Sequence, residues 1–214
     1  MNIALPALPL ALPQGQLDAL RAAYATPPRA YHDFGHVGEV LAHYADVAAG
    51  PGWLQPREVA LAVLYHDAIY QAGKRDNEAR SAQLAVADIA HWIPAVGVDA
   101  QRVAALVTLT AKHGAHKPRD FDPDPAAEDI RHFLDCDMAI LGASPGRFDA
   151  YNQAIAREYR DAMPAWMFRF NRQRFLRALL ASERIYLSDF FHERLEQNAR
   201  RNLRRALDPG NAVS

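Results

Sequence analysis

The apolar residues of this 214-residue chain recur at intervals of three and four positions almost throughout, and alternating runs bounded by turn residues are almost absent. That spacing places apolar side chains along one face of an α-helix, whereas a half-buried strand requires strict alternation. The sequence therefore predicts an all-α protein, a single bundle of about nine helices. The expected helices span residues 14–25, 36–49, 56–70, 76–93, 99–113, 124–142, 145–161, 164–182 and 188–207.

Residues that start or stop helices lie at these predicted boundaries. The segments "GPG" at 50–52 and "GASPG" at 142–146 separate consecutive helices, because glycine and proline interrupt helical backbone. Asp76, Asp99 and Ser188 each stand immediately before or at a predicted first turn, where their side chains can cap free backbone N–H groups. The division into helices is therefore consistent with the local chemistry.

The chain is predicted to form one helical domain over residues 14–208. Residues 1–13 are apolar but contain three prolines and no basic residue, unlike a signal peptide, so we expect an extended arm that packs on the body. Residues 209–214 are expected to form a flexible tail. No apolar stretch reaches the about 18 residues that span a bilayer. The single cysteine, Cys136, suits a reducing compartment, and we expect a soluble, cytoplasmic protein.

Opposite charges nearly cancel, since 24 Lys and Arg residues face 25 Asp and Glu residues. This balance does not favour duplex nucleic acid or an anionic membrane surface as partner, so we expect a small-molecule ligand. The segment "ARRNLRR" at 199–205 is either a phosphate-binding patch or, as is commoner, a charged face of a helix. The amphipathic C-terminal helices are compatible with a homodimer.

The helix predicted over 56–70 is apolar around most of its circumference, yet it contains His66 and Asp67 near its C-terminal end. A carboxylate removed from water needs hydrogen bonds, a cation or a metal ion. One interpretation pairs Asp67 with an arginine and makes His66 an ordinary core histidine. Taken alone, the dipeptide favours that interpretation, because two-residue patterns are common.

Other histidines and acids change this balance. His36 opens the helix predicted over 36–49, and Asp135 and Asp137 lie in an apolar part of the helix predicted over 124–142. With His66 and Asp67 they provide a mixed nitrogen and oxygen donor set from three helices. Such a set suits Mn, Fe, Co, Ni or Zn ions and leaves positions for water or a phosphate oxygen. The two aspartates of the third helix cannot share one helix face, and their spacing alone does not decide which is the ligand.

The order His, His-Asp, Asp resembles the signature of the HD superfamily of metal-dependent phosphohydrolases. The chain is most similar to small bacterial proteins described as predicted HD phosphohydrolases. The similarity runs from about residue 24 to residue 206, and it is carried by the segments "YHDFGHV", "LYHDAIY", "DNEARSA", "TLTAKHGAH", "FLDCDMAILG", "IAREYR" and "NARRNL".

This resemblance implies metal ligands at His36, His66, Asp67 and Asp137, with Asp135 as the fallback for the last position. It implies one divalent ion (Mn, Fe, Co, Ni, Zn or Mg), with room for a second. The implied reaction is hydrolysis of a small phosphate ester, for example a nucleotide, by water that the metal activates. The alternative function is a non-catalytic HD module that binds a metal or nucleotide and acts as a sensor or interaction protein.

A second "YHD" occurs at 31–33, but no histidine precedes it, so the order of the signature assigns the dyad to His66 and Asp67. Asp33 replaces the asparagine expected from the resemblance and is expected to cap the helix that begins near Phe34. His32 is expected to contact the substrate.

Further residues are candidates for the reaction or for substrate binding. We expect Asp67, Glu78 and His113 to be catalytic and Lys112 and Asn77 to bind substrate. Glu78 has two open interpretations, a general acid or base and a first-turn glutamate that complements the helix dipole. His113 and His116 also have two open interpretations: they could bind a second metal or a phosphate. Arg157, Glu158 and Arg172 could either reach the pocket or form ion pairs between helices.

Overall fold

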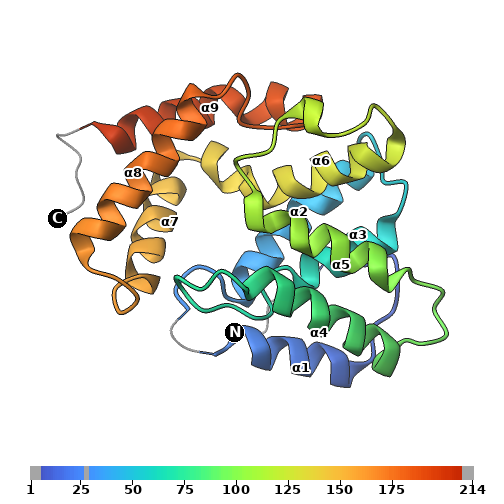
Figure 1. Cartoon of the computed structure of the whole chain (residues 1–214). Helices are drawn as coiled ribbons and strands as arrows, with labels where there is room; N and C mark the ends of the chain where they lie inside the picture. The colour runs from blue at the N-terminus through green and yellow to red at the C-terminus, as the bar shows by residue number, and fades with distance from the viewer. Residues whose placement is uncertain (1–5, 27–28, 209–214) are drawn as a thin grey trace.

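The computed structural model describes residues 6–26 and 29–208 (Figure 1). Over these residues the protein is all-α, with nine α-helices, three short 3-10 helices and no strand, which confirms the predicted fold class. The elements are α1 (Gln14–Tyr24), α2 (Phe34–Ala49), α3 (Pro56–Tyr65), α4 (Asn77–Trp92), α5 (Ala100–Leu109), η1 (Thr110–Lys112), η2 (Pro118–Asp120), α6 (Pro125–Met138), η3 (Ala139–Gly142), α7 (Pro145–Glu158), α8 (Ala165–Ala181) and α9 (Asp189–Leu207).

The helix starts agree closely with the sequence prediction, and the caps explain several of them. The side chain of Asp33 accepts hydrogen bonds from the N–H groups of Gly35 and His36 and so caps α2, as expected. Asp99 and Ser188 cap α5 and α9 in the same way. Asp76 stands at the N-cap position of α4, but its side chain makes no capping hydrogen bond. Capping therefore accounts for three of these four starts.

The helix expected over 56–70 is shorter than predicted, because α3 ends at Tyr65 and His66 is its C-cap. Beyond that point, side chains from elsewhere satisfy the backbone. The Arg29 guanidinium donates to the carbonyl oxygens of Asp67 and Ala68, and the Ser81 hydroxyl accepts from the N–H of Ile69. These hydrogen bonds take the place of those that a further helical turn would make, and they fix the conformation of the segment after His66.

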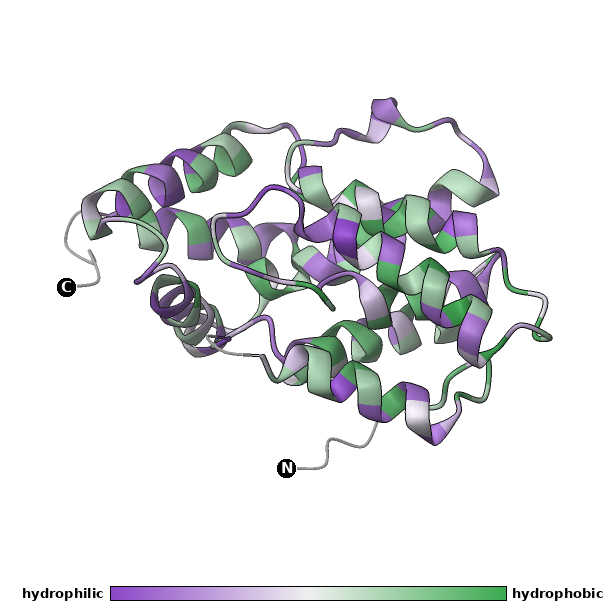
Figure 2. Cartoon of the chain, turned by 60° about the horizontal axis from the view of Figure 1, so that its bottom comes forward, coloured by the Kyte–Doolittle hydropathy of each residue, from purple (hydrophilic) through white to green (hydrophobic). Residues whose placement is uncertain are grey.

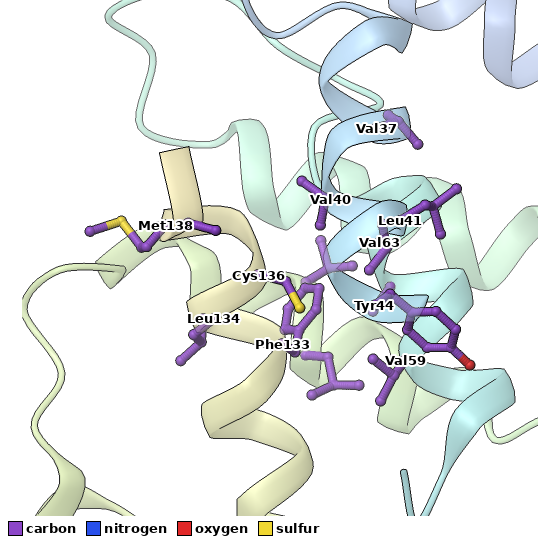
Figure 3. Packing of buried hydrophobic residues seen from close by; sticks show 14 of the residues in the cluster. Val37, Val40, Leu41, Tyr44, Val59, Val63, Phe133, Leu134, Cys136 and Met138 are labelled. Atoms are coloured by element: carbon purple, nitrogen blue, oxygen red, sulfur yellow. The ribbon is translucent and has the colours of Figure 1, made fainter. Parts of the chain in front are cut away.

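Helix α3 forms the centre of the hydrophobic core, since every residue from Val59 to Tyr65 is buried. It packs against α2, α4 and α5, while α2 also packs against α6. Figure 3 shows Phe133 and Cys136 pointing from α6 toward α2 and α3, whereas Leu134 and Met138 lie on the opposite side of the α6 ribbon. Each such large side chain contributes roughly 1.5–3 kcal/mol by leaving water. The core thus fixes the ends of α2, α3 and α6 relative to one another.

Helices α7 and α8 lie to one side of this body, with α9 running across them (Figure 1). Green and purple segments alternate along the helices in Figure 2, as expected for helices with one apolar face. The chain passes very close to α9 at Gly142, where an added Cβ atom would lie 2.6 Å from the Leu195 Cβ atom and 3.0 Å from its carbonyl oxygen. Glycine is therefore required sterically at the contact between η3 and α9.

The described part of the N-terminal arm, residues 6–13, is not helical, and its residues Leu8, Leu10 and Leu12 pack against the core. The expectations for residues 1–5 and for the tail at 209–214 concern segments outside the described residues. Among the described helices, none combines the length and the apolar character needed to cross a membrane.

Candidate metal centre

Four of the predicted ligands converge at the centre of the molecule. His36 lies in the first turn of α2, His66 and Asp67 directly follow α3, and Asp137 lies at the end of α6. The Nε2 atom of His36 is 3.1 Å from Nε2 of His66 and 3.2 Å from Oδ1 of Asp137. Oδ2 of Asp67 is 3.2 Å from Nε2 of His66 and 3.9 Å from Nε2 of His36. Residues far apart in the sequence therefore present their donor atoms to one small volume.

These separations match those of ligands that share one ion. Two donors about 2.1 Å from a metal are about 3.0 Å apart at a right angle and about 3.4 Å apart at a tetrahedral angle. The three shortest separations, 3.1 to 3.2 Å, lie between these two values, whereas Oδ1 of Asp137 is 3.6 Å from Nε2 of His66 and Oδ2 of Asp67 is 3.9 Å from Nε2 of His36. One donor atom each from His36, His66 and Asp67 lies within 4.8 Å of the other two, and Asp137 adjoins this group of three through the two imidazoles. The donor set therefore fits a divalent ion.

The orientation of His66 is set by its own helix. Its Nδ1 atom donates a hydrogen bond of 2.8 Å to the carbonyl oxygen of Val63. Because a carbonyl can only accept, Nδ1 carries a proton, and in the neutral ring Nε2 is left with its lone pair toward the cluster. The Nδ1 atom of His36 is buried and has no hydrogen-bond partner among the described residues. Both rings thus turn Nε2 toward the acids.

The two acids of the cluster are stabilised as carboxylates. Burial alone would raise the pKa of Asp137, but His113, His36 and His66 outweigh burial and hold this pKa well below its usual range. Burial would likewise raise the pKa of Asp67, and the neighbouring His66 and His32 lower it instead. Metal ligands must be deprotonated, so this environment favours the binding form of both acids.

Asp135, the fallback ligand, faces away from the cluster. Its carboxylate accepts hydrogen bonds from the N–H groups of Leu187 and Ser188 and from the Ser188 hydroxyl. It therefore holds the segment between α8 and α9 against α6. Of the two aspartates, Asp137 is therefore the one whose carboxylate lies beside the imidazoles, and the opposite directions of the two side chains follow from their spacing on one helix.

The arginine-paired interpretation of the buried acids does not fit. Within the described residues, the carboxylates of Asp67 and Asp137 form ion pairs with histidines and with no arginine. The nearby Arg29 is engaged with the backbone carbonyl oxygens of His32, Asp67 and Ala68. Histidines are thus the partners of both acids among the described residues.

His113 adds a fifth polar group to the centre, because its Nδ1 atom lies 2.6 Å from Oδ2 of Asp137. Its side chain is 38% exposed, whereas that of Asp137 is 6% exposed. His113 thus connects the buried cluster with solvent. His116 does not join it, since its Nε2 atom is hydrogen-bonded to the carbonyl of Leu109 and its ring lies against Phe121.

His32 forms a dyad with Glu158 beside the cluster. Its Nδ1 atom is 2.6 Å from Oε2 of Glu158, and its ring stacks on Tyr70 with centroids 4.2 Å apart. The other oxygen of Glu158 accepts hydrogen bonds from the N–H groups of Ala30, Tyr31 and His32. Glu158 is therefore the residue whose importance the sequence understated: the "AREYR" segment signalled it, but the backbone groups that it binds leave no sequence pattern.

The remaining candidates lie outside this arrangement. Asn77, expected to bind substrate, uses both amide groups on the backbone of Gln71 and so closes the loop before α4. Lys112 is exposed, and within the described chain the side chains of Lys112 and Glu78 make no hydrogen bond or ion pair. No contact brings Glu78 to the described cluster, so its position as a first-turn acid of α4 is the one the structure displays.

Two larger cavities lie beside the cluster rather than over it. One, of about 610 Å³, lies between α7 and α8, and the other, of about 420 Å³, includes Arg29, Arg157 and Glu158. None of the four candidate ligands lines either cavity. The cluster of histidines and aspartates and these two cavities are therefore separate features.

Comparison with protein-family models, with curated proteins and with solved structures returned no match for this chain. The interpretation of the centre consequently depends on its own geometry.

Proposed function

We propose that this protein is a metal-dependent phosphohydrolase of the HD superfamily that hydrolyses a small phosphate ester, for example a nucleotide. The observation that carries the proposal is the convergence of His36, His66, Asp67 and Asp137: the two imidazoles are 3.1 Å apart, and each aspartate places an oxygen 3.2 to 3.9 Å from both of them. The order of these residues along the chain agrees with the superfamily signature, and their chemistry agrees with a catalytic metal site.

In this proposal the four residues hold one divalent ion (Mn, Fe, Co, Ni, Zn or Mg). When bound, such an ion supplies Lewis acidity, which polarises a phosphoryl oxygen and makes water a stronger acid. The oxygen and nitrogen donors do not select one metal among these six. His113 and His116 do not form a second site of the same kind, because only His113 reaches the cluster.

Asp67 is the residue best placed to orient the attacking water and accept its proton. Its side chain is 13% exposed, whereas those of His36 and His66 are each 1% exposed, so Asp67 forms the solvent side of the cluster. His113 is partly exposed and fixed by Asp137, so it is placed to donate a hydrogen bond or a proton to the leaving oxygen. His32, fixed by Glu158, offers its remaining ring nitrogen to a phosphoryl oxygen.

The test combines metal analysis with an activity screen. Protein purified without chelator is analysed for divalent metals and then assayed on aryl phosphates, mononucleotides, deoxynucleotides and cyclic nucleotides with each candidate metal. We expect close to one metal per chain and turnover of at least one ester. The isosteric variant Asp67→Asn should lower that turnover by at least about 100-fold, since it removes the proposed base and a metal ligand.

Asp76→Asn is the matched control, because Asp76 is an exposed acid of the neighbouring loop and makes no capping bond. It should keep both the metal and the activity. Turnover that survives in Asp67→Asn would indicate a contaminant or another site. Bound metal without turnover of any ester would contradict the hydrolase and support the non-catalytic module.

A further inference from the structure

A cavity of about 610 Å³ lies between α7 and α8 and is lined also by Arg205 and Ala206 of α9. Figure 1 shows these three helices together, beside the body that carries the metal centre. Cavities that hold cofactors and small ligands have volumes of about 300–1,000 Å³ and combine apolar walls with a few polar groups. The groove has the size of such a site.

The charged groups of this groove are almost all cationic. Four arginines line it, Arg160, Arg169, Arg172 and Arg205, against one acid, Asp149. Asp149 is already paired with Arg205 at 2.7 Å. In a chain whose total charge is −1, this concentration of positive charge is local and not a general property of the surface. The groove therefore favours an anionic ligand.

Three of the arginines have no acidic partner within the described residues. Arg160 and Arg169 make no ion pair there, and Arg172 donates only to the neutral oxygen of the Asn152 side chain. A guanidinium group without an acidic partner can bind a phosphate through two parallel hydrogen bonds. Arg172 is also held in place, since it lies over the rings of Tyr151 and Phe175 at 4.9 and 5.5 Å.

The walls of the groove add aromatic surface. Tyr159 and Phe168 line it with ring centroids 5.4 Å apart, and Met163 and Leu176 extend the apolar lining. Aromatic and guanidinium planes bind flat heterocycles by stacking, with little dependence on which base is present. The combination of free guanidinium groups with aromatic walls matches a ligand that carries both a phosphate and a flat ring.

We propose that the groove between α7 and α8 is a second ligand site, separate from the metal centre, that binds an aromatic organic phosphate of mononucleotide size. The phosphate lies against Arg160, Arg169 and Arg172, and the ring lies against Tyr159 and Phe168. This site does not depend on the proposed hydrolysis, because none of the candidate metal ligands lines the groove.

The test measures binding by isothermal titration calorimetry to the full chain in the presence of chelator, so that metal-dependent binding and turnover do not contribute. The probes are the four ribonucleoside monophosphates, with ribose 5-phosphate and adenosine as fragments that lack the base or the phosphate. We expect saturable binding of at least one monophosphate with one site per chain. Each fragment should bind at least about tenfold more weakly.

The double variant Arg160→Glu with Arg169→Glu should weaken this binding by about tenfold or more, and the milder pair Arg160→Gln with Arg169→Gln by a smaller factor. Both residues are exposed, so circular dichroism should show an unchanged helical content. The matched control reverses two exposed arginines outside the groove, Arg119→Glu with Arg174→Glu, and should change the affinity by less than about twofold.

Three results would overturn the proposal: no saturable binding of any monophosphate, equal weakening in the control pair, or loss of binding in Asp67→Asn under chelator. The last result would place the ligand at the metal centre. Failure of the phosphatase screen would leave these measurements unaffected, because they are made without metal.

Discussion

Glu158 illustrates how much a single buried side chain can determine at the level of residues. One carboxylate joins the end of α7 to three consecutive N–H groups and to His32. Burial alone would raise the pKa of Glu158, but His32 and the backbone donors lower it to about 2. The charged form is thus stabilised in the folded protein relative to the unfolded chain.

Glu158→Gln should therefore destabilise the protein by about 2–3 kcal/mol at pH 7, since it weakens hydrogen bonds to a charged acceptor. Because the folded pKa lies below the unfolded value near 4.5, this stabilisation is complete above pH 4.5 and is lost as the pH falls toward 2. Urea unfolding of wild type and variant at several pH values should show a gap that narrows in that window. Glu193→Gln, at an exposed position of α9, is the control. A gap independent of pH would refute this role of the charge.

His113 can be tested separately from the ligands. His113→Asn should retain the metal, because four other donors remain, and should lower the turnover of the best ester by about 100-fold or more if His113 acts as the acid. Metal content and rate are measured on the same sample. His116→Asn is the matched control, since His116 bonds to the Leu109 carbonyl away from the cluster. Loss of metal together with activity in His113→Asn would instead make His113 a ligand.

The sequence predicted four converging donors, but the spacing alone could not decide between Asp135 and Asp137, and only the resemblance favoured Asp137. Both lie in the same apolar helix, but they face different groups. Asp135 faces the backbone N–H groups of Leu187 and Ser188, whereas Asp137 faces imidazoles. The same reason hid Glu158, whose main partners are backbone donors more than a hundred positions away. Bonds from a side chain to a distant backbone follow from the tertiary fold and have no local signature.

At the level of elements, helix starts were easier to predict than helix ends. Capping residues such as Asp33 and Asp99 act within a few positions, so their effect is visible in the sequence. The end of α3 is set instead by Arg29 and Ser81, which satisfy the backbone after His66 from other elements. The predicted helix therefore ended five residues too late, at residue 70 and not at Tyr65, because this long-range effect is not visible in the local sequence.

The contact between η3 and α9 gives a prediction at this scale. Gly142→Ala should cost about 1–3 kcal/mol, because the new methyl group would meet Leu195 and its carbonyl oxygen in a packed contact. Gly146→Ala, four residues later in α7, meets nothing within 4 Å and should be neutral or stabilise slightly through helix propensity. Thermal unfolding followed by circular dichroism compares the two. Equal effects would mean that η3 and α9 do not pack as closely as described.

At the scale of the whole molecule, the proposed metal should stabilise the fold. A ligand that binds only the folded state at 100 times its dissociation constant adds about 2.7 kcal/mol. For a chain of this length that corresponds to a rise in Tm of about 5–10 °C. Differential scanning fluorimetry with each metal and with chelator measures the shift. Asp76→Asn should show the same rise and Asp67→Asn a much smaller one; an equal rise in both would place the metal elsewhere.

The wide spacing of the proposed ligands along the chain also determines when, during synthesis, the complete donor set can form. His36 and Asp137 are 101 positions apart, and at 5–20 residues per second a ribosome needs about 5–20 s to travel between them. During that interval the nascent chain contains the His36 and His66 imidazoles and Asp67, but Asp137 has not yet been synthesised. The complete donor set exists only after α6 has emerged and packed. In the proposed function, uptake of the ion by the complete donor set therefore follows the synthesis and packing of α6.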